Sequence, residues 1–153
     1  MIKKTLEIRS IFLISRAMNA NVPHHLPNSA ILQNVLEMDI GTAYFYNNIV
    51  VVEAKEGVTI SYKTGFSFLV KGLQYMGTKP WVYIANRINS YSVNPNDYKY
   101  LEKIPTLRGI AIVTPTDLGK QNAALEANFF NKDFIILENL SSAYDWATAL
   151  LNK

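Results

Sequence analysis

Short apolar runs alternate with amphipathic segments along residues 38–153. The alternating side chains of residues 39–46 are typical of a half-buried strand, and the β-branched run at residues 49–52 is typical of a buried one. Asn47 and Asn48 lie between the two runs, and asparagine tolerates the backbone angles of a tight turn, so the three segments predict a β-hairpin. Further apolar runs predict strands at residues 81–84, 109–113 and 134–137.

Apolar residues at helical spacing predict four helices among these strands. The first runs to about Met76, where Gly77 ends it, and a short second helix covers about residues 95–103. The third helix carries Leu118 and Leu125 among its apolar positions. The expected N-caps of the three longer helices are, in chain order, Thr64, Thr116 or Asp117, and Ser141 or Ser142.

The element order is therefore β-β-α-β-α-β-α-β-α, which predicts an α/β fold with a mixed five-stranded sheet covered by helices. The strands after the hairpin are expected to be parallel and joined by right-handed crossovers. A chain of 153 residues suits one domain, which we place at residues 38–153. Residues 1–37 are interpreted as an N-terminal extension and linker, because Pro23 and Pro27 interrupt a mostly polar stretch at residues 19–34.

The first residues leave three alternatives open. Ile2, Leu6 and Leu13 share a helical face, so a short basic amphipathic helix is one of them. A dispensable, disordered tail is the second, and a natural start at Met38 is the third. No stretch of the sequence approaches the ~20 apolar residues of a transmembrane helix, so no membrane span is expected.

Charge and composition exclude several kinds of chemistry. Residues 1–16 hold four basic residues and one acidic residue, while the rest of the chain holds eleven of each sign. The domain therefore lacks the basic cluster that tracking of phosphates requires, and no nucleic-acid partner is expected. The absence of cysteine excludes disulfides and thiolate sites and fits a cytoplasmic location. His24 and His25 have no acidic or further histidine partner nearby, which favours a solvated loop and no metal site.

The order and spacing of residues 79–87 (KPWVYIANR), 107–113 (LRGIAIV) and 134–147 resemble a known domain. The resemblance is to the STAS domain, and within it to the SpoIIAA-like (STAS/SEC14-type) group of small uncharacterised bacterial proteins. It spans roughly residues 38–153. It implies a SpoIIAA-like fold and a regulatory, protein-binding role. In STAS antagonists, a phosphorylated serine after the third strand, near the start of the second helix, switches partner binding.

The segment that matches this phosphorylation site supplies the candidate functional residues. Ser90 and Ser92 occupy about the serine's place, while Asn89 stands where the family's pattern has aspartate, and no glycine follows. Arg87 would offer a bidentate hydrogen-bonding group and Tyr91 a flat contact for a partner. The alternative is structural: the asparagines of this loop bond its backbone, and Arg87 pairs with a nearby acid.

No catalytic or cofactor motif accompanies these residues. No histidine stands near a candidate serine, and no glycine-rich phosphate loop is present, so no cofactor is expected. The leading hypothesis is a non-enzymatic regulatory or protein-interaction module with a protein partner, and a homodimer is left open. The alternative is a small-ligand or lipid carrier, which needs an apolar pocket of several hundred Å³. An enzyme is the third hypothesis.

Overall fold

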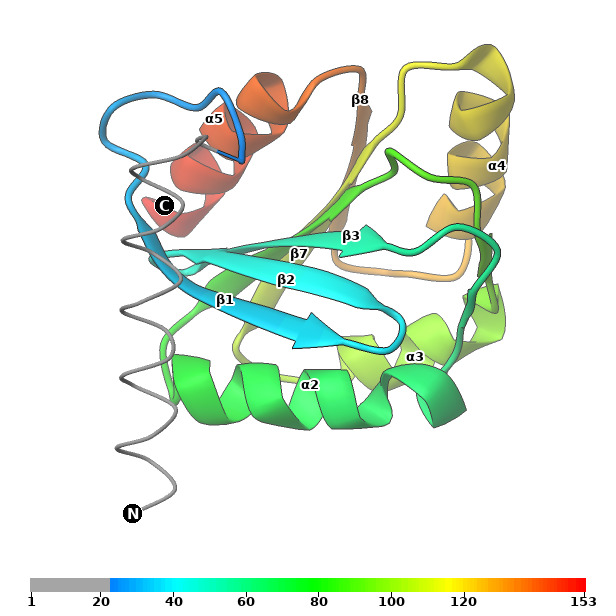
Figure 1. Ribbon diagram of the computed structural model, residues 1–153, viewed down its shortest axis with the longest axis horizontal. Helices are drawn as coiled ribbons and strands as arrows, with labels where there is room; N and C mark the ends of the chain where they lie inside the picture. The colour runs from blue at the N-terminus through cyan, green and yellow to red at the C-terminus, as the bar shows by residue number, and fades with distance from the viewer. Residues whose placement is uncertain (1–22) are drawn as a thin grey trace.

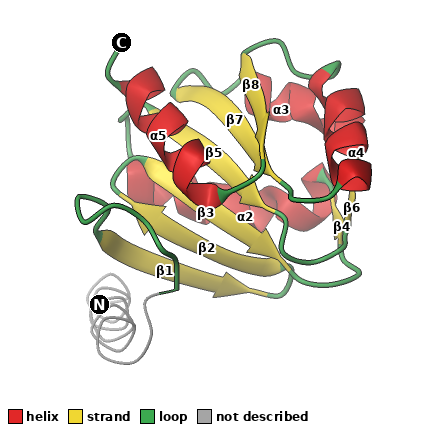
Figure 2. Cartoon of the chain, turned by 90° about the horizontal axis from the view of Figure 1, so that it is seen from above, coloured by secondary structure: helices red, strands yellow, loops and turns green. Residues whose placement is uncertain are grey.

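A six-stranded mixed sheet forms the centre of the molecule, in a computed structural model that describes residues 23–153 (Figure 1). Its strands in spatial order are β1 (Leu32–Met38), β2 (Gly41–Tyr46), β3 (Ile49–Ala54), β5 (Trp81–Asn86), β7 (Leu107–Val113) and β8 (Asp133–Leu137). The first three strands form an antiparallel meander, and the last four are parallel (Figure 2). The predicted fold class is confirmed, with six strands in the sheet in place of five.

The additional strand is β1, which lies within the segment assigned to the linker. Its residue Leu36 pairs with Ala43 of β2, so residues 32–37 belong to the sheet and the boundary at residue 38 is wrong for them. The sequence pattern of β1 is weak because β1 is an edge strand with a register irregularity between Leu32 and Asn34, which interrupts the alternation of buried side chains. The alternatives for the first sixteen residues lie outside the described residues.

Helices cover both faces of the sheet. α2 (Tyr62–Met76) and the short α3 (Tyr98–Glu102) lie below the sheet in Figure 1, and α5 (Leu140–Leu151) lies above it. α4 (Asp117–Ala127) lies beside the parallel strands and contributes Ala123 to the same core cluster as α2 and α3. Each face therefore has its own apolar core, one under α2 and α3 and one under α5.

The helix caps agree with the sequence in one case of three. Thr116 caps α4 as predicted. Ser61, three residues before Thr64, caps α2: its side chain accepts from the Thr64 N–H, and the Thr64 hydroxyl accepts from the Ser61 N–H, which makes a capping box. Asn139 caps α5 in place of the predicted serines. Each of these two helices begins with more than one polar residue of a capping type, so the sequence alone does not select the residue that caps it.

A second, two-stranded sheet ties the loop after β5 to the segment after β3. It pairs β4 (Thr59–Ile60) with β6 (Ser92–Val93) in parallel, just before the 3-10 turn η1 (Pro95–Asp97). Ser92 N–H donates to Val58 O and Asn94 N–H donates to Ile60 O, at 3.0 and 2.9 Å. This pairing holds the start of α2 beside η1 and α3.

Candidate functional site

Arg87 is bound within the protein. Its Nη1 and Nη2 atoms donate to the two carboxylate oxygens of Glu126 on α4, at 2.6 and 2.5 Å. Tyr98 of α3 donates its hydroxyl to the same carboxylate at 2.7 Å. Both charged side chains are largely buried, with 12 and 10% of their surface exposed. The structure agrees with the structural alternative, in which Arg87 pairs with a nearby acid. The guanidinium group that a partner was expected to bind is already bonded to Glu126.

The other predicted residues lie in the loop between β5 and β6. Asn89 Nδ2 donates to Ala54 O at 3.0 Å, which supports the backbone. Tyr91 is part-buried, with its ring centroid 5.5 Å from the Arg87 guanidinium carbon. Ser90 and Ser92 are exposed, as a modification site requires.

The position of Ser90 differs from what the family resemblance implies. A short strand follows Ser90, and the first helical turn begins at Pro95. The Ser90 N–H donates to a Glu56 carboxylate oxygen at 2.8 Å. A phosphate on Ser90 would therefore approach an acidic side chain and would lie away from the free N–H groups of a helix terminus.

A buried polar cluster that the sequence did not predict lies at the antiparallel side of the sheet. His24 Nδ1 is 2.6 Å from the Tyr46 hydroxyl and its Nε2 is 2.8 Å from Glu53 Oε2. Asn86 Nδ2 donates to the same Glu53 oxygen at 2.7 Å. The prediction of a solvated loop is wrong for His24, which is 7% exposed, and right for the exposed His25. Partners 22 and 29 positions away leave no local signal in the sequence.

Replacing His24 by alanine is expected to lower the free energy of unfolding by about 1–3 kcal/mol, because two hydrogen bonds are lost and buried polar atoms of Tyr46 and Glu53 lose a partner. Urea denaturation measures the change. His25→Ala is the matched control and is expected to stay within about 0.5 kcal/mol of the unsubstituted protein. Equal effects of the two substitutions would show that the cluster does not stabilise the fold.

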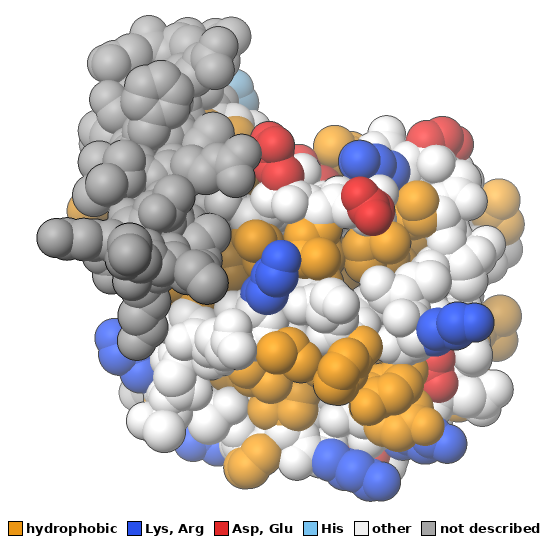
Figure 3. All heavy atoms as spheres, turned by 60° about the horizontal axis from the view of Figure 1, so that its bottom comes forward, with side chains coloured by type: hydrophobic (Ala, Val, Ile, Leu, Met, Phe, Trp, Pro, Cys, Tyr) orange, Lys and Arg blue, Asp and Glu red, His pale blue; other side chains and the backbone are white. Residues whose placement is uncertain are grey.

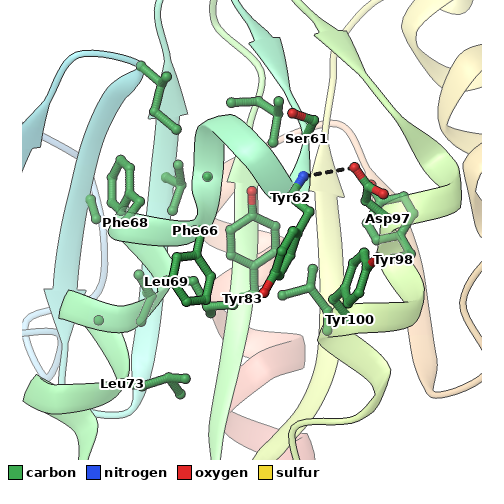
Figure 4. A pocket seen from close by; sticks show the side chains of 18 of the residues that line it. Ser61, Tyr62, Phe66, Phe68, Leu69, Leu73, Tyr83, Asp97, Tyr98 and Tyr100 are labelled. Atoms are coloured by element: carbon green, nitrogen blue, oxygen red, sulfur yellow. Dashed lines mark hydrogen bonds between the residues drawn. The ribbon is translucent and has the colours of Figure 1, made fainter.

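A pocket of about 150 Å³ lies between α2, α3 and the sheet (Figure 4). Its lining is almost entirely apolar and includes Phe45, Phe68, Leu69, Leu73, Met76 and Leu101. Two glycines of α2, Gly65 and Gly72, line it one above the other at a spacing of seven residues. A Cβ added at Gly65 would meet no atom within 4 Å. Glycine at these two helix positions therefore leaves room for the pocket on this face of α2.

Aromatic side chains surround the mouth of the pocket. Tyr62 and Phe66 of α2 are 42 and 47% exposed, and the Tyr62 ring stacks on Tyr100 with centroids 4.1 Å apart. Asp97 Oδ2 accepts from the Tyr62 N–H at 2.8 Å and so joins α2 to η1. Figure 3 shows hydrophobic side chains gathered on the face that α2 covers, with basic side chains around them. A space with an apolar interior and an aromatic entrance can hold a small hydrophobic molecule.

The sequence contains one signal for this pocket, the two glycines of α2. Glycine in a helix interior costs about 0.5–1 kcal/mol relative to alanine, so two glycines on one face of α2 indicate that space is kept there.

Within residues 23–153, no helix is both long and apolar enough to cross a bilayer. No group of three or more potential metal ligands occurs in the same described residues.

No protein-family profile and no curated protein matches the chain. The structure is similar to the crystal structure of an uncharacterized protein from the DUF3478 family of Shewanella loihica PV-4, which is described as having a SpoIIAA-like fold. The identity is 14%, the match covers 74% of this chain and 90% of that chain, and the TM-score is 0.47.

Proposed function

We propose that this protein is a non-enzymatic binding module whose pocket beneath α2 takes a small apolar molecule. The observation that carries the proposal is the apolar cavity of about 150 Å³ with two helix glycines in its wall. A dry apolar cavity of about this volume accommodates benzene in another protein. The pocket is smaller than the several hundred Å³ expected from sequence for a small-ligand or lipid carrier. The ligand is therefore the size of one ring or a short alkyl group.

The energetic cost of the cavity supports a binding role. Apolar side chains that line an unfilled space lose packing contacts, so the pocket lowers stability relative to a filled core. The two glycines add about 0.5–1 kcal/mol each. Alanine at Gly65 or Gly72 would reduce both costs without a close contact, because the nearest atom to the added Cβ at Gly72 is 4.0 Å away. A ligand that fills the space offsets these costs.

The polar groups of the lining support binding in preference to catalysis. Within residues 23–153 the lining includes no histidine, and its carboxylate, Asp97, accepts a hydrogen bond from the Tyr62 backbone. The hydroxyl of Tyr98 is bonded to Glu126. These groups hold α2, η1 and α3 in place, so their hydrogen bonds are structural.

Titration with toluene, followed through the methyl resonance of Met76, tests this proposal. Met76 lines the pocket and is 5% exposed, so its methyl group reports entry of an apolar ring. A saturable shift at Met76 that is absent from methionines outside the lining is expected. The absence of a saturable shift up to the solubility limit of toluene would overturn the proposal. Native mass spectrometry of the freshly purified protein shows whether a small molecule co-purifies.

A protein-interaction role is the second candidate, and exposed apolar side chains favour it. Ile88, in the loop after β5, is 63% exposed, and Leu118, in the first turn of α4, is 68% exposed. These two connections follow the neighbouring parallel strands β5 and β7. The Arg87 N–H donates to Val113 O at 2.9 Å, which holds those connections side by side. Together with the exposed Ser90, they offer a surface at the carboxyl ends of the strands for a protein partner in the cytoplasm.

Affinity capture under native conditions tests the second candidate. The Ser90→Glu variant is expected to recover less of a partner, because the new carboxylate adds charge beside Glu56 on the proposed surface. Ile88→Ser should have the same effect through loss of apolar contact. A partner that binds both variants as well as the unsubstituted chain would show that this surface is not the binding site.

A further inference from the structure

Tyr83 is a polar residue in the wall of the pocket. It belongs to β5, which has β3 and β7 as neighbours, so it lies on a central strand of the sheet. Its side chain packs with the core under α2 and α3 and is nevertheless part-exposed. Because Tyr83 is also among the residues that line the pocket, the pocket accounts for this exposure. Figure 4 shows the Tyr83 ring amid the other lining side chains.

The hydroxyl of Tyr83 differs from the other polar groups of the wall. Tyr98 donates to Glu126, and Asp97 accepts from Tyr62. The Tyr83 hydroxyl takes part in none of the side-chain hydrogen bonds formed among residues 23–153. Tyr83 lines the pocket and its hydroxyl has no side-chain partner in the described part of the chain, so this hydroxyl is free to bond a ligand there.

The surroundings of this hydroxyl favour a neutral ligand. Burial raises the pKa of Tyr83 well above its ordinary value, and Glu126 adds to the rise while Arg87 opposes it. Tyr83 is therefore a neutral hydrogen-bond donor at physiological pH. An anionic group beside it would lose its water in an apolar space and would approach the Glu126 carboxylate, whose attraction to Arg87 is already satisfied.

We infer that the ligand is a neutral, single-ring-sized hydrophobic molecule with one hydrogen-bond acceptor, which the Tyr83 hydroxyl recognises. This inference rests on the proposed function and adds the chemical class of the ligand. Phenol is the simplest probe of that class, toluene is its apolar counterpart, and benzoate is its anionic counterpart. Tyr83 is then the residue that determines specificity in the pocket.

The experiment compares phenol, toluene and benzoate on the full chain and on Tyr83→Phe. The substitution removes one hydroxyl and leaves the ring, so the affinity for phenol is expected to fall by about 3- to 10-fold. The affinity for toluene is expected to change by less than about twofold, and benzoate is expected to bind more weakly than phenol. Tyr75→Phe is the matched control, because Tyr75 is absent from the pocket lining and its hydroxyl bonds Gln33 at the surface.

The outcomes separate the two proposals. If toluene and phenol both fail to bind the unsubstituted chain, the proposed function fails and the inference fails with it. If both bind and Tyr83→Phe weakens neither, or weakens both equally, the pocket binds apolar molecules but Tyr83 does not select among them. If Tyr83→Phe does not fold, the Cζ resonance of Tyr83 in the unsubstituted protein decides: phenol must shift it more than toluene does, and equal shifts overturn the inference.

Discussion

Replacing Glu126 by alanine is expected to lower the free energy of unfolding by about 3–5 kcal/mol, because the substitution leaves the buried Arg87 guanidinium without its counter-charge. Glu126 is 8% exposed and accepts from both Arg87 and Tyr98, so three hydrogen bonds are lost together. Water cannot replace them without opening the contact between α4 and the loop after β5. Urea denaturation of the purified variant measures the loss.

Two controls separate the buried pair from an ordinary surface contact. Glu138 forms a salt bridge with Lys120 but is 67% exposed, so Glu138→Ala is expected to leave stability almost unchanged. The double variant Arg87→Met/Glu126→Leu removes both charges and is expected to be more stable than Glu126→Ala alone. If Glu126→Ala were as harmless as Glu138→Ala, the Arg87–Glu126 pair would not hold this end of the molecule together.

Replacing Gly65 by leucine is expected to fill the pocket and to weaken toluene binding by at least about tenfold, since a leucine side chain occupies the space that the ligand needs. The same variant is expected to unfold at a higher temperature. Leucine has a higher helix propensity than glycine by about 0.5–1 kcal/mol, and it buries apolar surface against the lining. The titration followed at Met76 and thermal unfolding measure the two effects.

Ser67→Ala is the matched control for this substitution. Ser67 is an exposed residue of α2 outside the pocket lining, so alanine there raises helix propensity without entering the pocket. Its toluene affinity is expected to equal that of the unsubstituted chain. A Gly65→Leu variant that keeps its affinity would place the binding site elsewhere and would contradict the proposed function.

The sequence by itself determined the elements whose signal is local. The β-branched run of β3 and the apolar run of β7 predicted buried strands, which the structure contains. The helical spacing of Leu69, Leu73 and Met76 defined the core-facing side of α2. Phe66 has the same spacing but is 47% exposed. The turn between β2 and β3 was also predictable, and Asn47 adopts the expected left-handed conformation with φ of 55°. Each of these depends on neighbours within a few positions.

Only the tertiary structure decided what each polar side chain does. Arg87 meets Glu126 at a separation of 39 residues, and His24 meets Glu53 at 29. α4 also buries Glu126 and exposes Leu118 and Leu125, which reverses what hydrophobicity alone predicts. The physical reason is that a pairing energy depends on distance in space, which a local pattern does not contain.

The pocket also depends partly on the sequence and partly on the tertiary structure. The sequence contained Gly65 and Gly72, but the pocket beside them also needs a second wall. Ala43 and Phe45 of β2 and Tyr83 of β5 form that wall on the face of the sheet that α2 covers. A cavity is a property of side-chain volume summed over several elements. Composition and spacing therefore determined that helices cover a sheet, and packing between those layers decided where a ligand fits.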